Sequence, residues 1–170
     1  MPMRPFMDRF PEIGPRETRS LRVSGLPGLP DGEYGFIEMY CDEPHCDCRR
    51  VMIAVLRPET GWGKIFATIS YGWENAEFYR AWGPHCDPIE MIGPSLNPLG
   101  PQTQSSPALL SLFRTLIESP DYVERLKRHY SMFRQTVDQE HGHSAHPRTH
   151  PPSSPRRHGR GSNRGRPRSR

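Results

Sequence analysis

Long apolar runs are missing from this sequence. Only 34% of its 170 residues are apolar and 20 are prolines, a lean supply for a core of that size. The longest apolar stretches, such as VMIAVL, have the length of a strand and are far too short to span a membrane. The N-terminus also lacks the apolar core of a secretory signal. We therefore expect a cytoplasmic protein with no membrane contact, in which thiols stay reduced.

Common catalytic motifs are absent as well. The chain has no His-Glu-x-x-His, no Gly-x-Ser-x-Gly and no Gly-x4-Gly-Lys-Ser/Thr. These absences exclude the usual zinc-protease helix, the nucleophile elbow of the hydrolases and the phosphate-binding loop of the nucleotide hydrolases. No stretch identifies a reaction, so the sequence favours binding over catalysis.

Acidic residues are missing from residues 141–170, which hold eight arginines, five histidines and five prolines. Because the whole chain has a formal net charge of +4, residues 1–140 alone carry −4. A segment so charged and so poor in apolar residues cannot offset its ordering entropy, and we expect it to be disordered. Its arginines could bind nucleic acid, but only through non-specific contacts with phosphates.

Three strands are predicted, at about 33–41, 49–57 and 64–71. The first and third have two alternating faces, and the second is a β-branched apolar run typical of a buried strand. In the first strand, Tyr34, Phe36 and Tyr40 share one face, whereas Ile37, Met39 and Cys41 share the other. Turn residues separate the second strand from the third, so the economical arrangement is a three-stranded antiparallel meander. Residues 1–25 show little pattern and are expected to be irregular or to contain one short helix, which leaves residues 26–140 as the folded domain.

Helices are expected after the strands, which makes the fold class α+β. A short helix is predicted with Asn75 as its cap, followed by a helical pair at about 107–118 and 120–138. Ser106 and Ser119 each precede a proline, a pattern typical of a helix N-terminus.

The last of these helices has a clear apolar stripe. Its members recur at three- and four-residue steps: Tyr122, Val123, Leu126, Tyr130, Phe133 and Val137. The basic residues, Arg134 among them, are expected elsewhere around the helix. For His129 an exposed or capping position is favoured over a catalytic one.

Three cysteines lie within eight residues, in the stretch YCDEPHCDCRRV. Cys41 ends one predicted strand, and Cys46 and Cys48 precede the next, so a hairpin brings the three sulfurs together. The fourth cysteine of the chain, Cys86, lies further along in GPHCDP. Four thiolates form a tetrahedral structural zinc site. We therefore expect zinc, held by all four cysteines.

The fourth ligand is the least specific part of this prediction. His85 or His45 could replace Cys86, because imidazole is an equally good zinc ligand. Arg49 and Arg50, which follow the cluster, could offset its negative charge. Two other interpretations remain open: the thiols could be buried and reduced, behaving as small apolar groups, or they could form a redox pair.

These residues resemble an uncharacterised bacterial protein family that shares a Cys-x4-Cys-Asp-Cys-Arg-Arg hairpin. The resemblance covers roughly residues 25–137 and includes the closing YVERLKRHYSMFR. It implies a metal-binding domain and no activity. Some relatives end in a short cysteine-rich motif of the SEC-C type, whereas RRHGRGSNRGRPRSR stands in that place here and has no cysteine.

Two functions are therefore expected. The favoured one is a small intracellular zinc-binding module with a structural metal, which acts on an unidentified protein partner. The alternative is a metal- or thiol-dependent enzyme with an open coordination position at the cysteine cluster. Three protein ligands plus water would indicate the enzyme, and four protein ligands the module.

Overall fold

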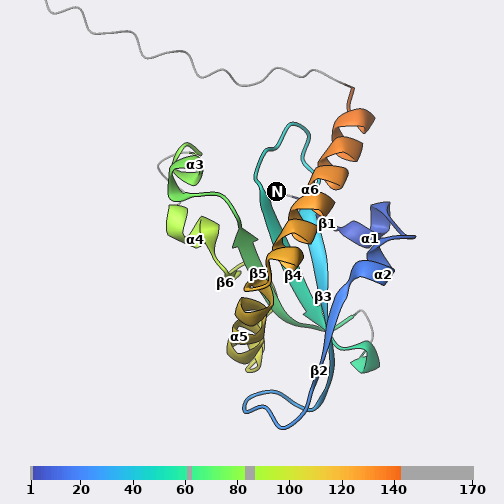
Figure 1. Cartoon of the computed structure of the whole chain (residues 1–170), viewed down its shortest axis with the longest axis vertical. Helices are drawn as coiled ribbons and strands as arrows, with labels where there is room; N and C mark the ends of the chain where they lie inside the picture. Colours follow the sequence, from blue (N-terminus) through green and yellow to red (C-terminus); the bar gives the residue numbers. More distant parts are fainter. Residues whose placement is uncertain (1, 61–62, 83–86, 143–170) are drawn as a thin grey trace, which may run out of the picture.

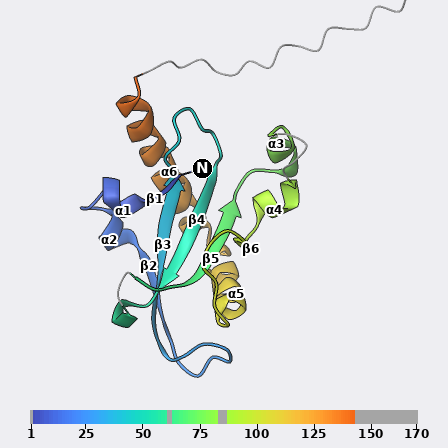
Figure 2. The ribbon, with the colours of Figure 1, turned by 180° about the vertical axis from the view of Figure 1, so that it is seen from behind.

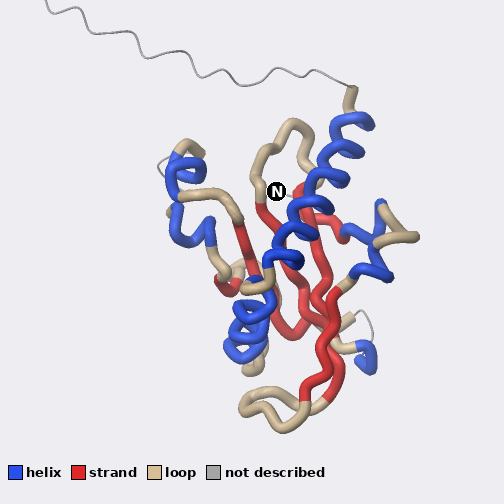
Figure 3. The backbone as a smooth tube through the Cα atoms, viewed as in Figure 1, coloured by secondary structure: helices blue, strands red, loops and turns tan. Residues whose placement is uncertain are grey.

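The computed structural model describes residues 2–60, 63–82 and 87–142. Within these ranges, six strands form one antiparallel sheet (Figures 1 and 3). The strands are β1 (Met3–Pro5), β2 (Arg19–Val23), β3 (Gly32–Cys41), β4 (Arg50–Leu56), β5 (Ile65–Gly72) and β6 (Ser95–Leu96). Their order is β1-β3-β4-β5-β6, and β2 pairs with β3 on the same side as β1.

Two long helices, α5 and α6, follow the last strand, and shorter helical segments lie between the strands. The helices are α1 (Phe6–Arg9), α2 (Gly14–Glu17), α3 (Ala76–Arg80), α4 (Pro88–Ile92), α5 (Ser106–Ile117) and α6 (Pro120–Glu140), with a 3-10 turn η1 (Pro58–Thr60). No helix in the described ranges combines the length and the apolar character needed to span a membrane.

The α+β class is confirmed, but the prediction of a three-stranded sheet is wrong. The predicted strands correspond to β3, β4 and β5, and three further strands extend them on both sides. Residues 1–25, expected to be irregular, contribute β1 and β2. In β2 only Val23 is buried, so this strand lacks the alternation that sequence patterns reveal and forms by pairing with β3. β6 is two residues long and pairs with Ile69 and Ser70.

The predicted helices are present, but the serine capping predicted for the long pair is found only in part. Asn75 caps α3 as predicted, because its side-chain oxygen accepts a hydrogen bond from the Phe78 amide at 2.9 Å. Ser106 lies inside α5 instead of capping it, and its hydroxyl donates to the Phe66 carbonyl at 3.0 Å. Ser119 does occupy the N-cap position of α6, but its side chain makes no capping bond.

The main core lies between the sheet and the two long helices. Phe36 and Tyr40 of β3 and Ile53 of β4 face α5 and α6, where Phe113 and Phe133 are fully buried. In Figure 1, α6 passes in front of β3 and β4, and α5 lies beside β5. Burying these aromatic and branched side chains contributes about 1.5–3 kcal/mol each.

The second face of the sheet is only partly covered. Ile37, Ala54 and Leu56 form a small apolar group there, against which Met7 of α1 packs. Figure 2, which looks at this face, shows α1 and α2 at one edge and α4 with β6 at the other. No helix of the described residues lies over the centre of β4 in that view.

Residues 143–170 and 83–86 lie outside the described residues. The predictions for the basic segment, for Cys86 and for His85 fall on them.

Candidate metal centre

Three cysteine sulfurs meet at the end of the β3–β4 hairpin. Cys41 is the last residue of β3, and Cys46 and Cys48 lie in the loop that leads into β4. The three Sγ atoms all lie within 4.8 Å of one another. The convergence predicted from the hairpin is therefore present in the fold, and these thiols form no disulfide.

The backbone of the cysteine loop is strained at two residues. His45 has a φ of 59° and Arg49 a φ of 46°, and these are the two non-glycine residues with positive φ among the described residues. Each of them immediately flanks the Cys46–Cys48 segment. A non-glycine residue in this region costs about 1–3 kcal/mol and persists only where surrounding contacts or function demand it.

Burial and mutual hydrogen bonding shift the pKa values of the three thiols in different directions. Cys41 and Cys48 are buried and Cys46 is half-buried. The hydrogen bonds from Cys46 and Cys48 lower the pKa of Cys41 to about 2, against the effect of burial. The contact with Cys41 raises the pKa of Cys46 to about 11 and also raises the pKa of Cys48. These shifts favour a single thiolate, on Cys41, when no metal is bound.

Arg134 of α6 is the main support of the cysteine loop. Its Nη1 donates to the carbonyl oxygens of Cys41 at 3.2 Å and Glu43 at 2.9 Å, while its Nη2 donates to Asp138 at 2.7 Å. The side chain is almost fully buried, and its charge contributes to the lowered pKa of Cys41. It therefore fixes the first turn of the loop and places a positive charge beside the thiols.

The N-terminal segment fastens the other side of the loop. Asp42 forms ion pairs with Arg9 and, at 3.0 Å, with Arg4, and its amide donates to the Pro2 carbonyl at 2.9 Å. Arg9 also pairs with Glu140 at the end of α6, at 2.6 Å. These contacts join residues 2–9, the cysteine loop and the last turn of α6.

Tyr130 holds the far end of the loop. Its hydroxyl accepts a hydrogen bond from the Arg49 amide at 3.1 Å and donates to Asp47 at 3.3 Å. Burial raises the pKa of this hydroxyl, so it stays protonated and can do both. The loop is thus anchored by α6 at two points one turn apart, Tyr130 and Arg134.

The other predicted site residues lie differently. His45 is exposed and does not belong to the group of ligand atoms formed by the three cysteines. Arg49 pairs with Asp47 at 3.0 Å and Glu74 at 3.2 Å, so its charge is matched by carboxylates. Arg50 contacts the Met91 sulfur of α4 at 2.9 Å.

Arg134 was not predicted as part of the site. The sequence suggested that it lies away from the apolar stripe of the last helix, and this interpretation is wrong, because only 8% of the residue is exposed. Its position directly after the stripe residue Phe133, one turn beyond Tyr130, is the signal that could have placed it near the hairpin.

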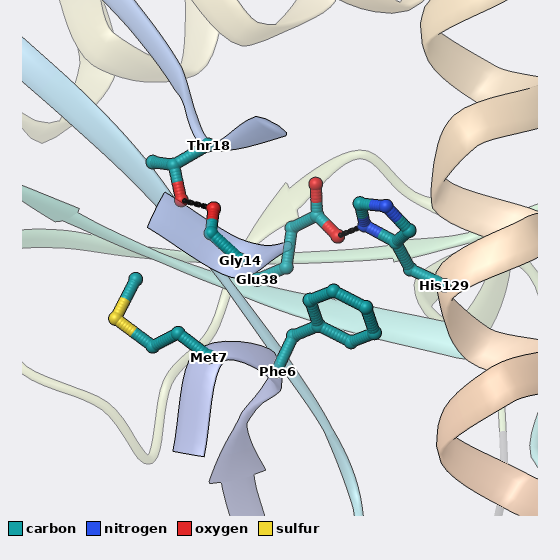
Figure 4. A pocket seen from close by; sticks show the side chains of 6 residues that line it. All are labelled: Phe6, Met7, Gly14, Thr18, Glu38 and His129. Atoms are coloured by element: carbon teal, nitrogen blue, oxygen red, sulfur yellow. Dashed lines mark hydrogen bonds and ion pairs between the residues drawn. The ribbon is translucent and has the colours of Figure 1, made fainter. Parts of the chain in front are cut away.

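A second buried polar cluster joins β3 to α6. His129, expected to be exposed or capping, is 1% exposed. Its Nδ1 lies 2.6 Å from Glu38, and Phe6 stacks on the ring with centroids 4.0 Å apart (Figure 4). Its Nε2 lies 3.1 Å from Glu17. The space around them leaves no room for a molecule of the size of water. The cluster therefore fastens α2 to the core and offers no substrate site.

Comparisons with known proteins give no relative for the chain: no family model, curated protein or solved structure matches it.

Proposed function

We propose that the protein is a zinc-binding module, in which Cys41, Cys46 and Cys48 hold one zinc ion. The observation that carries this proposal is the mutual approach of their three sulfurs to within 4.8 Å. In a tetrahedral site with Zn–S bonds of about 2.3 Å, sulfurs lie about 3.8 Å apart. Any two sulfurs therefore need to approach by at most about 1 Å to bind one metal. The lean core would gain stability from that metal.

We further propose Cys86 as the fourth ligand, with His85 and His45 as alternatives. Support comes from the described residues on either side of residues 83–86. The Tyr79 hydroxyl of α3 donates to the Arg49 carbonyl at 2.9 Å, and Arg50 contacts Met91 of α4. The chain before and after Cys86 is thus in contact with Arg49 and Arg50, the residues that follow Cys48. His45, by contrast, is exposed and would have to turn inward to bind the metal.

The role assigned to the metal is structural. Zinc would replace the protons of the raised-pKa thiols and lock the loop that Arg134 and Tyr130 already support. The surface so stabilised is proposed to bind a protein partner. Reduced thiols of this kind persist in a reducing compartment, so we place the protein in the cytoplasm.

The second candidate is an enzyme with three cysteine ligands and a water molecule on the metal. It needs as protein ligands only the three cysteines whose sulfurs converge among the described residues. Catalytic zinc sites keep such an open position, whereas structural sites are closed by four protein ligands.

Metal analysis of the purified full-length protein tests the proposal. We expect about one equivalent of zinc, lost in Cys41→Ser, Cys46→Ser and Cys48→Ser and weakened in Cys86→Ser. Ala54→Ser, which introduces the same hydroxyl at a buried position of β4, is the matched control and should keep its zinc. If Cys86→Ser kept full zinc affinity and His85→Ala lost it, His85 would be the fourth ligand.

A further inference from the structure

The uncovered centre of the second sheet face contains a pocket of about 380 Å³. Its floor includes Met52 of β4 and Ser70 of β5, which lie directly opposite each other in the sheet, and Met39 of β3 is opposed to Met52 on the other side. Opposed residues in an antiparallel sheet point to the same face, so Met52 and Ser70 both point away from α5 and α6. Figure 2 shows this face between α1 on one side and β6 on the other.

The walls of the pocket come from opposite edges of the sheet. Met3 of β1 forms one wall, and the segment after β6 forms the other with Asn97, Leu99 and Gly100. Gly100 lets this segment approach the sheet, because a Cβ there would lie 2.5 Å from the Thr68 Cβ. Asn97 is fixed by its Nδ2, which donates to the Ser70 hydroxyl at 2.9 Å. The wall is therefore part of the ordered fold.

The chemistry of the lining is mostly apolar with one charge. Met3, Met52 and Leu99 supply apolar surface, and the Leu99 side chain is almost fully exposed at the rim. Arg50 is the one charged residue among the described residues that line the pocket, and its contacts with Glu90 and Met91 hold it in place. Small-molecule sites combine roughly 300–1,000 Å³ of mostly apolar space with a few polar groups that orient the ligand.

We propose that this pocket binds a small apolar carboxylate, with its hydrocarbon part over Met52 and its carboxylate on the Arg50 guanidinium. Methionine side chains adapt to aliphatic and aromatic shapes, and guanidinium pairs with carboxylates through parallel hydrogen bonds. The volume suits a compact ligand and is too small for a folded element. The arginine-rich residues 143–170 are not expected to occupy the pocket, because they would place positive charge beside the positive charge of Arg50.

The site goes beyond the zinc proposal but adjoins it, because Cys48 also lines the pocket. Cys41 follows Met39 by two residues along β3 and therefore lies on the same face. A ligand in the pocket would thus lie beside the proposed metal centre without being one of its ligands.

Calorimetric titration of the full-length protein with octanoate, 1-octanol and octylammonium tests the assignment. We expect saturable binding of one octanoate, at least about tenfold tighter than 1-octanol, with octylammonium the weakest of the three. Arg50→Gln should remove the preference for octanoate over octanol, and Met52→Trp should block all three by filling the pocket. Zinc content, measured in each variant, distinguishes a failure of this site from a failure of the metal centre.

A matched pair of surface variants keeps the test independent of folding. Leu99→Ser, at the rim, should weaken octanoate binding, whereas Ile89→Ser removes another highly exposed apolar side chain that does not line the pocket and should change nothing. The proposal would be overturned if the three ligands bound with equal affinity. It would also be overturned if Met52→Trp bound octanoate as tightly as the unmodified protein. A third result would also overturn it: the protein does not bind octanoate but self-associates, and Leu99→Ser abolishes the self-association. The face would then be an interface between copies of the chain.

Discussion

The Arg134 guanidinium donates hydrogen bonds to the backbone carbonyl oxygens of Cys41 and Glu43, and thereby ties the cysteine loop to α6. This contact joins residues about 90 positions apart, and one of them, Cys41, belongs to the group of three thiols. Because the loop also contains two strained residues, His45 and Arg49, its geometry depends on such external support.

Arg134→Met should therefore destabilise the fold and weaken metal binding together. The substitution leaves two carbonyl oxygens without their donor, at about 1–3 kcal/mol for each acceptor that stays buried. Urea unfolding and a zinc competition assay measure the two effects. Arg128→Met, on the same helix but more than half exposed in its side chain, is the matched control. Equal losses in both variants would show that Arg134 has no special part in the loop.

Zinc binding should release protons from the cluster. In the metal-free protein the pKa of Cys41 is lowered, whereas those of Cys46 and Cys48 are raised, so the latter two must lose their protons when they bind zinc near neutral pH. Zinc affinity should therefore fall as the pH falls. Calorimetry in buffers of different ionisation enthalpy counts the protons. Binding with no proton release would mean that these thiols are not the ligands.

His129→Leu should lower the free energy of unfolding by about 1–3 kcal/mol, because Glu38 loses a partner at 2.6 Å in the core. The loss should appear in thermal or urea unfolding while zinc content is retained. Glu124→Gln provides the comparison, since it breaks the exposed Lys127–Glu124 pair and should cost less than about 1 kcal/mol. A loss in His129→Leu as small as in Glu124→Gln would contradict a structural role for the buried cluster.

Deletion of residues 141–170 tests whether this segment binds nucleic acid. If it does, binding by its eight arginines should be independent of sequence and steeply salt-dependent. Five engaged arginines would give a slope of about −4 to −5 for log affinity against log salt on duplex DNA. The shortened chain should lose this binding and keep its zinc. Equal binding by both chains would place the nucleic-acid contact on the folded domain.

The sequence pattern was a good guide to the centre of this fold and a poor one to its edges. β3, β4 and β5 are revealed by runs of apolar, aromatic and β-branched residues, such as VMIAVL in β4, because most of their side chains are buried. β1, β2 and β6 are short or half-exposed, and their pairing with neighbours, which no local pattern records, makes them strands.

The candidate site likewise has a part that the sequence predicted and a part that it did not. The meeting of Cys41, Cys46 and Cys48 follows from a single hairpin, so sequence spacing was enough to predict it. The support from Arg134 and the Glu38–His129 pair depends on how α6 lies across the sheet, which is set by packing over long sequence separations. One local signal was present: Glu38 alternates with the core residues Phe36 and Tyr40, and a carboxylate at a core position needs a partner.

X-ray absorption at the zinc edge, on full-length protein purified without chelator, tests the central claim most directly. The account predicts about one zinc per chain with a shell of four sulfurs at about 2.3 Å. Three sulfurs and one nitrogen would keep the metal centre and move the fourth position to a histidine. A protein that neither retains nor rebinds zinc, or one whose zinc has a shell dominated by nitrogen and oxygen, would contradict it.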